Sequence, residues 1–298
     1  MKVTGVTIIR NAVINDYPVV ESIKSVLPVV DEFIVLVGDC SDETEALIRN
    51  IESEKIRIKH SIWDLTLRTG GTILAVETNK VLDLVSKDTD WIFYIQADEV
   101  IHEKDHANIR MAMEEFKNDD RIDGLLFHYL HFYGTYDYIG DSRKWYNVET
   151  RIIKNNPEIR SYRDAQGFRK KDGRKLNVAK IQANVHHYGW VKDPKNMKIK
   201  QKNVAGFWNN DDDSLKTFLE SEDFFDYRQF DSLKKYTGTH PVFMENRIKR
   251  KNWNVELDIK KNNLKFKYRI LHFIEKWTGK RLFTFSNHRI VAKQSVVS

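Results

Sequence analysis

The fold of this chain is decided by Trp91–Glu99, which reads Trp-Ile-Phe-Tyr-Ile-Gln-Ala-Asp-Glu. The run of five apolar residues is too short for a helix, and it passes directly into a doubly acidic end. This pattern is typical of a central strand of a parallel sheet, which is buried on both faces. Because ligands of open α/β sheets bind at the carboxyl ends of the strands, the stretch predicts both a fold class and a binding edge.

A second stretch of the sequence repeats this pattern. Phe33–Val37 is apolar and is followed by Gly38-Asp39-Cys40-Ser41-Asp42. We therefore expect Asp39, Asp98 and Glu99 to lie along one edge that binds a nucleotide or another polyanion. The alternative is that each acid is an ordinary turn or helix-capping residue.

Strands and helices alternate along residues 1–123, which predicts right-handed βαβ units and a Rossmann-like, mostly parallel sheet flanked by helices. The pattern changes after Asp123. Residues 124–192 predict an α+β half with long strands covering the acidic edge, and residues 193–298 predict a mostly helical, basic appendage. We thus expect one domain over 1–192, followed by a separate C-terminal region. The expected strands of the first half are Val3–Ile9, Phe33–Val37, Ile56–Ile62 and Trp91–Ile95.

The composition excludes several kinds of protein. Cys40 is the only cysteine among 298 residues, which excludes an internal disulfide framework and a zinc cage made of cysteines alone. A lone thiol also fits a reducing compartment. No apolar run approaches the roughly 20 residues of a membrane-spanning helix, and Met1–Arg10 lacks the residue order of a signal peptide. These features predict a soluble, cytoplasmic protein.

Several of these motifs together resemble those of family 2 glycosyltransferases with the GT-A fold. The resemblance covers roughly the first 190 residues and is nearest to the branch with an Asp-Ala-Asp-Glu string. The residues that carry it are Arg10-Asn11, Val35–Asp42, Gly70, Asn79 and Ile95–Glu99.

The resemblance implies a hexosyl-type glycosyltransferase of polysaccharide or cell-envelope synthesis. Its donor would be a nucleotide sugar, with UDP favoured and GDP, CMP and dTDP left open, and its acceptor a glycan or a lipid-linked molecule. Residues 1–123 would hold the donor and 124–192 the acceptor. Transfer would invert the anomeric carbon in a single displacement. The donor-binding residues implied are Arg10, Asn11, Asp39, Gly70, Asn79, Gln96 and Asp98.

The resemblance also implies a divalent metal, Mn²⁺ or Mg²⁺, which a hard carboxylate ligand would hold against the diphosphate. Asp98 is the first candidate ligand. Gln96 stands where the family carries an acid, so it can hydrogen-bond a ribose hydroxyl but brings no charge to a metal. Glu99 is a candidate to replace that acid, or else forms a structural salt bridge.

A late histidine is the other metal ligand that the resemblance implies. Adjacent residues of a strand point to opposite faces, so at most one of His186 and His187 faces the site. We slightly prefer His186, and the choice between them stays open. An imidazole ligand would favour Mn²⁺ over Mg²⁺.

An inverting transfer also needs a general base near the acceptor hydroxyl. Asp141, Glu149 and Asp164 are the candidates, of which one at most acts. Arg151 is placed to hold Glu149 or a phosphate, and Asp164 lies in an irregular segment where catalytic residues are common. The alternative for each is a surface ion pair, or a turn cap in the case of Asp141.

The net charge of +6 is unevenly spread. Residues 241–298 hold 14 Lys and Arg against 4 Asp and Glu, a balance of +10, which leaves −4 for the remainder. Residues 262–277 predict an amphipathic helix whose basic side suits an anionic membrane, which would place the protein peripherally at the inner face. The alternative is that the helix packs its apolar stripe on the domain.

Two other functions stay open besides the transferase. Gln96 in place of an acid would suit a catalytically impaired relative that binds a nucleotide or a glycan. The basic tail would suit a protein that binds an anionic polymer, although nucleic acid is not favoured because no recognisable binding motif accompanies the charge.

Overall fold

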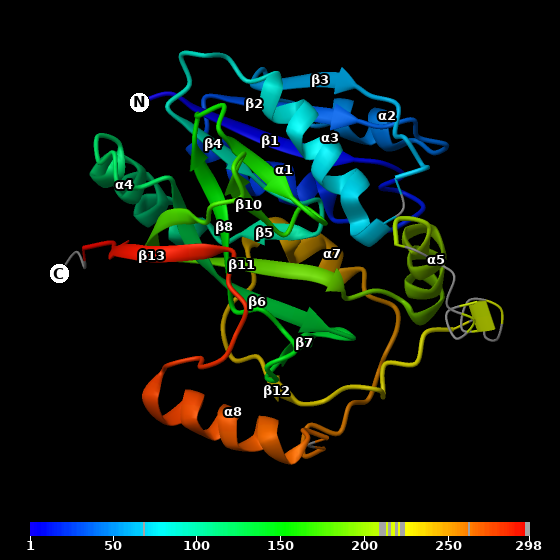
Figure 1. Cartoon of the computed structure of the whole chain (residues 1–298). Coiled ribbons are helices and arrows are strands. Elements are labelled where there is room, and N and C mark those ends of the chain that lie inside the picture. The colour runs from blue at the N-terminus through cyan, green and yellow to red at the C-terminus, as the bar shows by residue number, and fades with distance from the viewer. Residues whose placement is uncertain are drawn as a thin grey trace.

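The computed structural model describes residues 1–67, 69–208, 213, 216, 217, 220, 224–261 and 263–295. Its main sheet runs in the order β12-β7-β6-β8-β4-β1-β2-β3, and the long strand β11 joins it beside β6 (Figure 1). The α/β class expected from the sequence is confirmed.

The nucleotide-binding half predicted from the sequence is the parallel part of this sheet. The strand β1 lies between β2 and β4, and β2 also pairs with β3, all in parallel. Gly5 of β1 permits this packing, because a Cβ there would lie 2.4 Å from the ring of Phe33. The strands are β1 (Val3–Ile9), β2 (Glu32–Val37), β3 (Ile56–His60) and β4 (Trp91–Tyr94).

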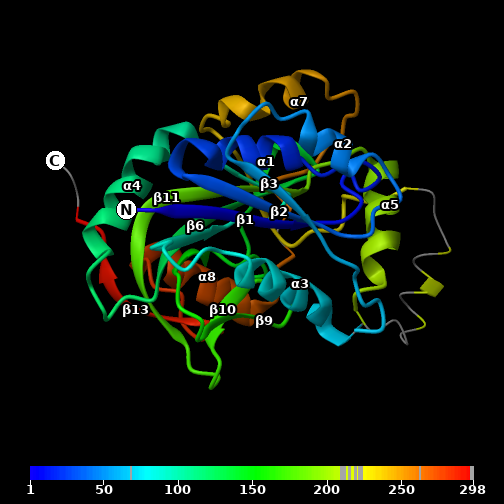
Figure 2. The same cartoon turned by 90° about the horizontal axis from the view of Figure 1, so that it is seen from above.

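Helices cover both faces of the parallel strands. Figure 2 shows α1 and α2 on one face and α3 on the other. The apolar residues of α1 and α4 belong to one core, and those of α3 belong to a second core on the opposite face. The helices are α1 (Val19–Val26), α2 (Thr44–Arg49), α3 (Thr72–Asp83) and α4 (His106–Phe116).

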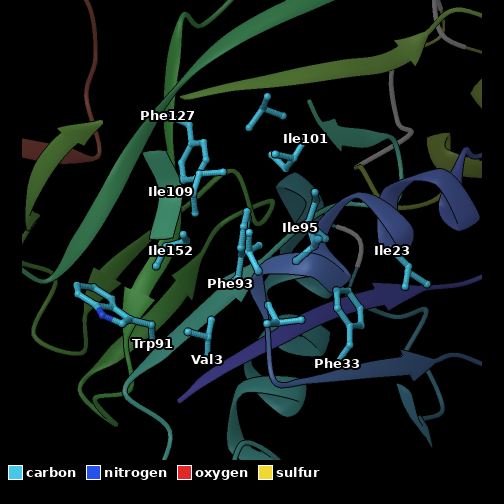
Figure 3. Close-up of a cluster of buried hydrophobic side chains, with 14 of the residues drawn as sticks. Val3, Ile23, Phe33, Trp91, Phe93, Ile95, Ile101, Ile109, Phe127 and Ile152 are labelled. Atoms are coloured by element: carbon cyan, nitrogen blue, oxygen red, sulfur yellow. The ribbon is translucent and has the colours of Figure 1, made fainter. Parts of the chain in front are cut away.

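The first core explains why Trp91–Ile95 reads as a continuous apolar run. Trp91, Phe93 and Ile95 project from this segment into the cluster with Phe33 and Phe127 (Figure 3). The intervening residues of the run, Ile92 and Tyr94, point into the second core. Because both faces of the strand are covered, alternation of polar and apolar residues is absent from it.

The second half of the sheet is mainly antiparallel. The strand β8 pairs antiparallel with both β4 and β6, while β11 runs parallel to β6 and to β13 and antiparallel to β5. A separate hairpin is formed by β9 and β10. The strands are β5 (Glu99–Ile101), β6 (Gly124–Tyr133), β7 (Thr135–Gly140), β8 (Val148–Lys154), β9 (Ile159–Tyr162), β10 (Gly167–Lys170) and β11 (Leu176–Trp190).

The C-terminal region contributes to the same sheet. The strand β12 (Leu233–Lys235) pairs with β7, and β13 (His288–Lys293) pairs with β11. Strands beyond residue 192 thus extend the main sheet. The domain boundary expected at residue 192 stays a prediction. The helices described here are α5 (Pro194–Ala205), α7 (Glu245–Lys249) and α8 (Phe266–Thr278). Among the described residues, no helix is long and apolar enough to cross a membrane.

Candidate active site

The carboxyl ends of β1 and β2 bring Arg10 and Asp39 together. The Arg10 guanidinium donates to both Asp39 oxygens at 3.2 and 3.1 Å, and the backbone N–H of Trp63 donates to Asp39 at 3.1 Å. Burial alone would raise the pKa of Asp39, but these hydrogen bonds hold it below its ordinary value. The pair is partly exposed, so an ionised carboxylate and a guanidinium stand at this edge.

Asn11 fixes the loops that carry this pair. It adopts a left-handed conformation with φ of 55°, and its side-chain oxygen accepts a hydrogen bond from the Ser41 N–H at 2.8 Å. Its own N–H donates to the sulfur of Cys40 at 3.3 Å. Asn11 therefore connects the turns after β1 and β2 at the edge where the sequence predicted donor binding.

Asp98, just after β4, lies in a buried cluster of positive charge. Lys200 of α5 places Nζ 3.3 Å from Asp98 Oδ2 and donates to the carbonyl of Gly189 at 2.8 Å. Burial alone would raise the pKa of Asp98, but nearby positive charge, of which the Lys200 ammonium is the largest contributor, lowers it to about 2. Gly189 is required here, because a Cβ at that position would lie 2.5 Å from Asp98 Oδ2. The result is a carboxylate that stays ionised at any ordinary pH.

The ring of His187 is oriented towards Asp98 by a second histidine. Nε2 of His131 lies 2.7 Å from the Tyr146 carbonyl oxygen and therefore carries the proton that it donates. Nδ1 of His131 then accepts from Nδ1 of His187 at 3.1 Å. Nε2 of neutral His187 is left unprotonated, 3.7 Å from Asp98 Oδ2. Burial lowers the pKa of both histidines, which favours these neutral rings.

His186 points to the other face of β11, as neighbouring strand residues must. Its Nε2 lies 3.2 Å from the hydroxyl of Tyr236, and its ring packs against Phe132. The structure thus places His187, and not His186, beside Asp98, and which of the two histidines acts stays a prediction.

Glu99 has the partner that the sequence left as an alternative. Its two oxygens accept from Nε and Nη2 of Arg151, each at 2.8 Å, and both side chains are fully buried. The Tyr129 hydroxyl at 2.7 Å and the Gln96 N–H at 3.1 Å also donate to it. With four donors on this carboxylate, Glu99 forms the salt bridge that the sequence left as an alternative, and its part in metal binding stays a prediction.

Gln96 connects this ion pair to the segment that carries Asp164. Its side-chain amide donates to the Ala165 carbonyl at 3.3 Å, and Arg151 donates to the Gln166 carbonyl at 2.8 Å. Arg163 and Ala165 have φ of 56° and 57°. Non-glycine residues in this region cost about 1–3 kcal/mol each and are concentrated at functional sites. Gln96 thus holds a strained loop in place.

Asp164 projects from that loop towards the turn before α3. A Cβ on Gly71 would lie 2.8 Å from the Asp164 Cβ, and Gly70 and Gly71 have φ of 57° and 71°. Asp164 is half-buried, and burial raises its pKa above its ordinary value. A carboxylate with a raised pKa is suited to accept a proton.

The other two candidate bases have different surroundings. Glu149 of β8 is buried, and burial, partly offset by Arg151, raises its pKa to about 7. Asp141 accepts from Lys276 of α8 at 2.9 Å and lies 3.5 Å from His272. Asp141 therefore anchors α8, which corresponds to the ion-pair alternative.

Asn79 also has a structural partner. Its side-chain oxygen accepts from the Ser161 N–H at 2.8 Å, and its amide donates to the Ser161 carbonyl at 3.4 Å. These two bonds fasten α3 to β9. They occupy both ends of the amide that was expected to contact the donor.

Sequence reasoning missed Lys192, Lys200 and Tyr17. Lys192 is fully buried and donates to the Asp16 carbonyl, and burial lowers its pKa to about 7. The two ammonium groups lie 5.2 and 4.9 Å from the ring centre of Tyr17. No local pattern marks these residues, since Lys200 is one lysine among several on α5.

A divalent metal would find two protein ligands at this edge. The inferred lone pair of His187 Nε2 and the carboxylate of Asp98 lie 3.7 Å apart, and both groups are able to bind a cation. In this structure the Lys200 ammonium supplies that charge. Within the described part of the chain, no group of three or more His, Cys, Asp or Glu side chains is arranged to hold a metal. Further ligands would have to come from the substrate or from water.

Neither a family model nor a curated protein matches this sequence. Solved structures similar to it include S. aureus TarS, with 14% identity over 68% of this chain and 39% of that chain, and a TM-score of 0.39. The structure of TarS residues 1–349 in complex with UDP has 14% sequence identity and a TM-score of 0.40, and the match covers 74% of this chain and 70% of that chain. Glucosyl-3-phosphoglycerate synthase from Mycobacterium tuberculosis, in complex with Mn²⁺, UDP and phosphoglyceric acid, is also similar. Its sequence identity is 17%, the match covers 44% of this chain and 43% of that chain, and the TM-score is 0.31.

The chain spans about 39% of the length of TarS. The likeness concerns the α/β arrangement, so the functional assignment rests on the residues of this chain.

Proposed function

We propose that this protein is a glycosyltransferase that moves a sugar from a nucleotide sugar, with UDP as the favoured nucleotide, to a hydroxyl of a glycan or a lipid-linked acceptor. The observation that carries the proposal is the ionised, largely but not fully buried Asp98 beside Lys200 and His187 at the carboxyl edge of the sheet. Open α/β sheets bind ligands at this edge. A nucleotide diphosphate is the ligand whose charge this arrangement would match.

The donor would lie across the ends of β1, β2 and β4. Asp39, with Arg10 beside it, would accept hydrogen bonds from the ribose or base, because its carboxylate is ionised and partly exposed. Lys200 is the cation nearest Asp98 and would neutralise the diphosphate. Charge on the leaving diphosphate grows during transfer, so a fixed cation there would lower the barrier.

Asp98 and His187 would hold a divalent metal if the enzyme uses one. One carboxylate oxygen and one imidazole nitrogen suit Mn²⁺ better than Mg²⁺. The metal would supply Lewis-acid neutralisation of the leaving diphosphate. His131 would keep Nε2 of His187 unprotonated for this contact, through the bond between their Nδ1 atoms.

Asp164 is our choice for the general base. Its carboxylate would take the proton of the acceptor hydroxyl while that oxygen bonds to the anomeric carbon. The bond from the anomeric carbon to the diphosphate oxygen would break in the same step, with inversion. The strained loop and its connection to Gln96 would hold the base in place, which gives Gln96 a positioning role.

Calorimetric titration tests the donor site directly. UDP, GDP, CMP and dTDP are each titrated with and without Mn²⁺ into the wild-type chain, Asp98→Asn and the matched control Asp172→Asn. Asp172 is an exposed acid in a turn, paired with Arg174. We expect one nucleotide to bind, with about a tenfold or larger loss in Asp98→Asn and none in the control.

An assay of transfer or hydrolysis of the matching nucleotide sugar then distinguishes an active glycosyltransferase from a catalytically impaired relative. Binding without turnover, in the presence of Mn²⁺ and a range of glycan acceptors, would favour the impaired relative. Absence of binding by all four nucleotides would contradict the donor site. Circular dichroism of each variant excludes unfolding as the cause of a loss.

A further inference from the structure

Helix α8 is attached to the domain by its polar side. Glu275 accepts from Arg143 at 2.7 Å, while Lys276 and His272 lie 2.9 and 3.5 Å from Asp141. No residue of this helix is buried. The inward side of α8 therefore combines these polar contacts with the partly buried Leu271 and Ile274, while its largest aromatic side chains face solvent.

The outward side of α8 carries large aromatic residues. Phe266, Phe273 and Trp277 are 78%, 70% and 82% exposed. Positions 266, 273 and 277 are spaced by seven and four residues, so they share one face of the helix. The following segment adds Phe283 and Phe285, which are 90% and 67% exposed. We call these five side chains the aromatic ridge.

The aromatic ridge is unusual for a surface. Single exposed apolar residues are common, but contiguous exposed patches mark sites of interaction. Figure 1 shows α8 beyond β7 and β12, at the end of the sheet opposite β3. Of these side chains, Phe285 lies 6.0 Å from the guanidinium groups of Arg163 and Arg169, and the other four are at least 70% exposed.

Positive charge surrounds the ridge. Residues 260–281 contain eight Lys and Arg and a single acid, Glu275. That acid faces inward, where Arg143 and Arg281 are its partners. Lys267 and Lys280, which flank the ridge, are exposed. The outer surface therefore combines aromatic side chains with the exposed ammonium groups of Lys267 and Lys280.

We propose that the aromatic ridge docks onto the surface of an anionic lipid bilayer. Aromatic residues settle at the boundary between headgroups and acyl chains, and Lys and Arg bind acidic headgroups. A second copy of the chain fits less well, because two facing copies would bring their basic fringes together. Among the described residues, Phe266, Phe273 and Trp277 do not pack against the domain, since each is at least 70% exposed. Residue 262, where the predicted helix was to begin, lies outside the described residues.

Docking stands apart from the proposed catalytic activity. A lipid-linked acceptor, which docking would bring within reach of the acidic edge, rests on that proposed function. The two are distinguishable by experiment, because nucleotide binding reports on the sheet edge and vesicle binding reports on α8.

Vesicle sedimentation tests the docking. The full chain is incubated with vesicles of phosphatidylcholine alone and with vesicles containing phosphatidylglycerol. Phe273→Ser/Trp277→Ser removes the centre of the ridge, and Lys267→Glu/Lys280→Glu reverses part of its charge. The matched control is Ile62→Ser, which removes an apolar side chain that is 81% exposed on another surface.

We expect the wild-type chain and the control to bind the anionic vesicles and to dissociate as salt rises. Each ridge variant should lose about tenfold or more of this binding and keep the nucleotide affinity of the wild type. Absence of binding to anionic vesicles, or equal binding by the Phe273→Ser/Trp277→Ser variant, would overturn the proposal. So would a concentration-dependent dimer that the same variant abolishes, because the ridge would then be an interface between copies.

Discussion

The acidic edge after β4 and the helix α8 depart from ordinary burial in opposite directions. At the edge, Asp98 and Lys192 are titratable groups largely withdrawn from water, although burying a charge is costly unless it is paired. At α8, Trp277 and Phe283 are large apolar groups left in water. A folded chain tolerates such departures where function requires them. The edge is suited to an anionic ligand and the helix to an anionic surface, so the proposed partners of both regions are negatively charged.

Within the acidic edge, the largest effect should come from Asp164→Asn. If Asp164 takes the acceptor proton, its amide cannot, and turnover should fall about 100- to 10,000-fold while nucleotide affinity stays near that of the wild type. Turnover with the matching nucleotide sugar, together with calorimetry, measures both quantities. Asp141→Asn is the matched control, since its ion pairs hold α8.

The competing candidate for the base is Glu149. A large loss in Glu149→Gln with Asp164→Asn unaffected would move the role to Glu149, whose pKa of about 7 also suits a base. The rate would then rise as the pH passes through about 7, where that carboxyl loses its proton.

The next largest effect should be on stability, in Glu99→Gln. The change leaves the fully buried Arg151 without its carboxylate, and breaking such a pair costs about 3–5 kcal/mol. Urea unfolding measures the free energy of unfolding. The double variant Glu99→Gln/Arg151→Met should recover part of the loss, because no buried charge is then unpaired. A cost in Glu99→Gln below about 1 kcal/mol would show that the pair is not structural.

Local sequence patterns were sufficient to predict the fold of the first half, because each of its strands is marked by its own apolar residues. The acidic edge followed from the same patterns, since the carboxyl ends of parallel strands meet. Asp39 and Asp98 could therefore be placed before any contact was known. The parallel strands that the sequence predicted are present at nearly the expected residues.

The roles of neighbouring side chains could not be read in this way, because distant residues decide them. Asp98 and Glu99 are adjacent acids, yet Arg151, 52 positions from Glu99, turns one of them into a structural pair. In the same way, the backbone of Ser161, 82 positions from Asn79, engages the side-chain amide of Asn79 in a structural hydrogen bond. In α8 the amphipathic pattern was legible, but which side faces outward depended on the contacts of Asp141 and Arg143.

The two histidines of β11 offer a smaller and more specific comparison. His187→Gln should weaken the Mn²⁺ dependence of nucleotide binding about tenfold or more, because the nitrogen beside Asp98 is lost. His186→Gln changes the neighbouring residue on the opposite face and should leave that dependence intact. Titration of the nucleotide at increasing Mn²⁺ measures the effect. Equal losses in both variants would contradict the assignment of His187 to the site.

A further effect should be a pH dependence of stability that originates in Lys192. Burial lowers the pKa of this lysine from 10.5 to about 7. Between these values the unfolded chain binds a proton that the folded chain does not, so the contribution of Lys192 to stability rises with pH over this window. Below about pH 7 both states hold the proton and the contribution is constant. Lys192→Met removes this titration, and the exposed Lys87→Met is the matched control.

The quantity to compare is the change in the free energy of unfolding from pH 7 to pH 9, measured in urea. It should be less positive in Lys192→Met than in the wild type and in Lys87→Met, because only the first variant loses a buried, titrating ammonium. If all three chains changed alike, Lys192 would keep its proton in the folded state. Its positive charge would then persist beside Asp98, and the edge would hold two permanent cations, Lys192 and Lys200, for an anionic ligand.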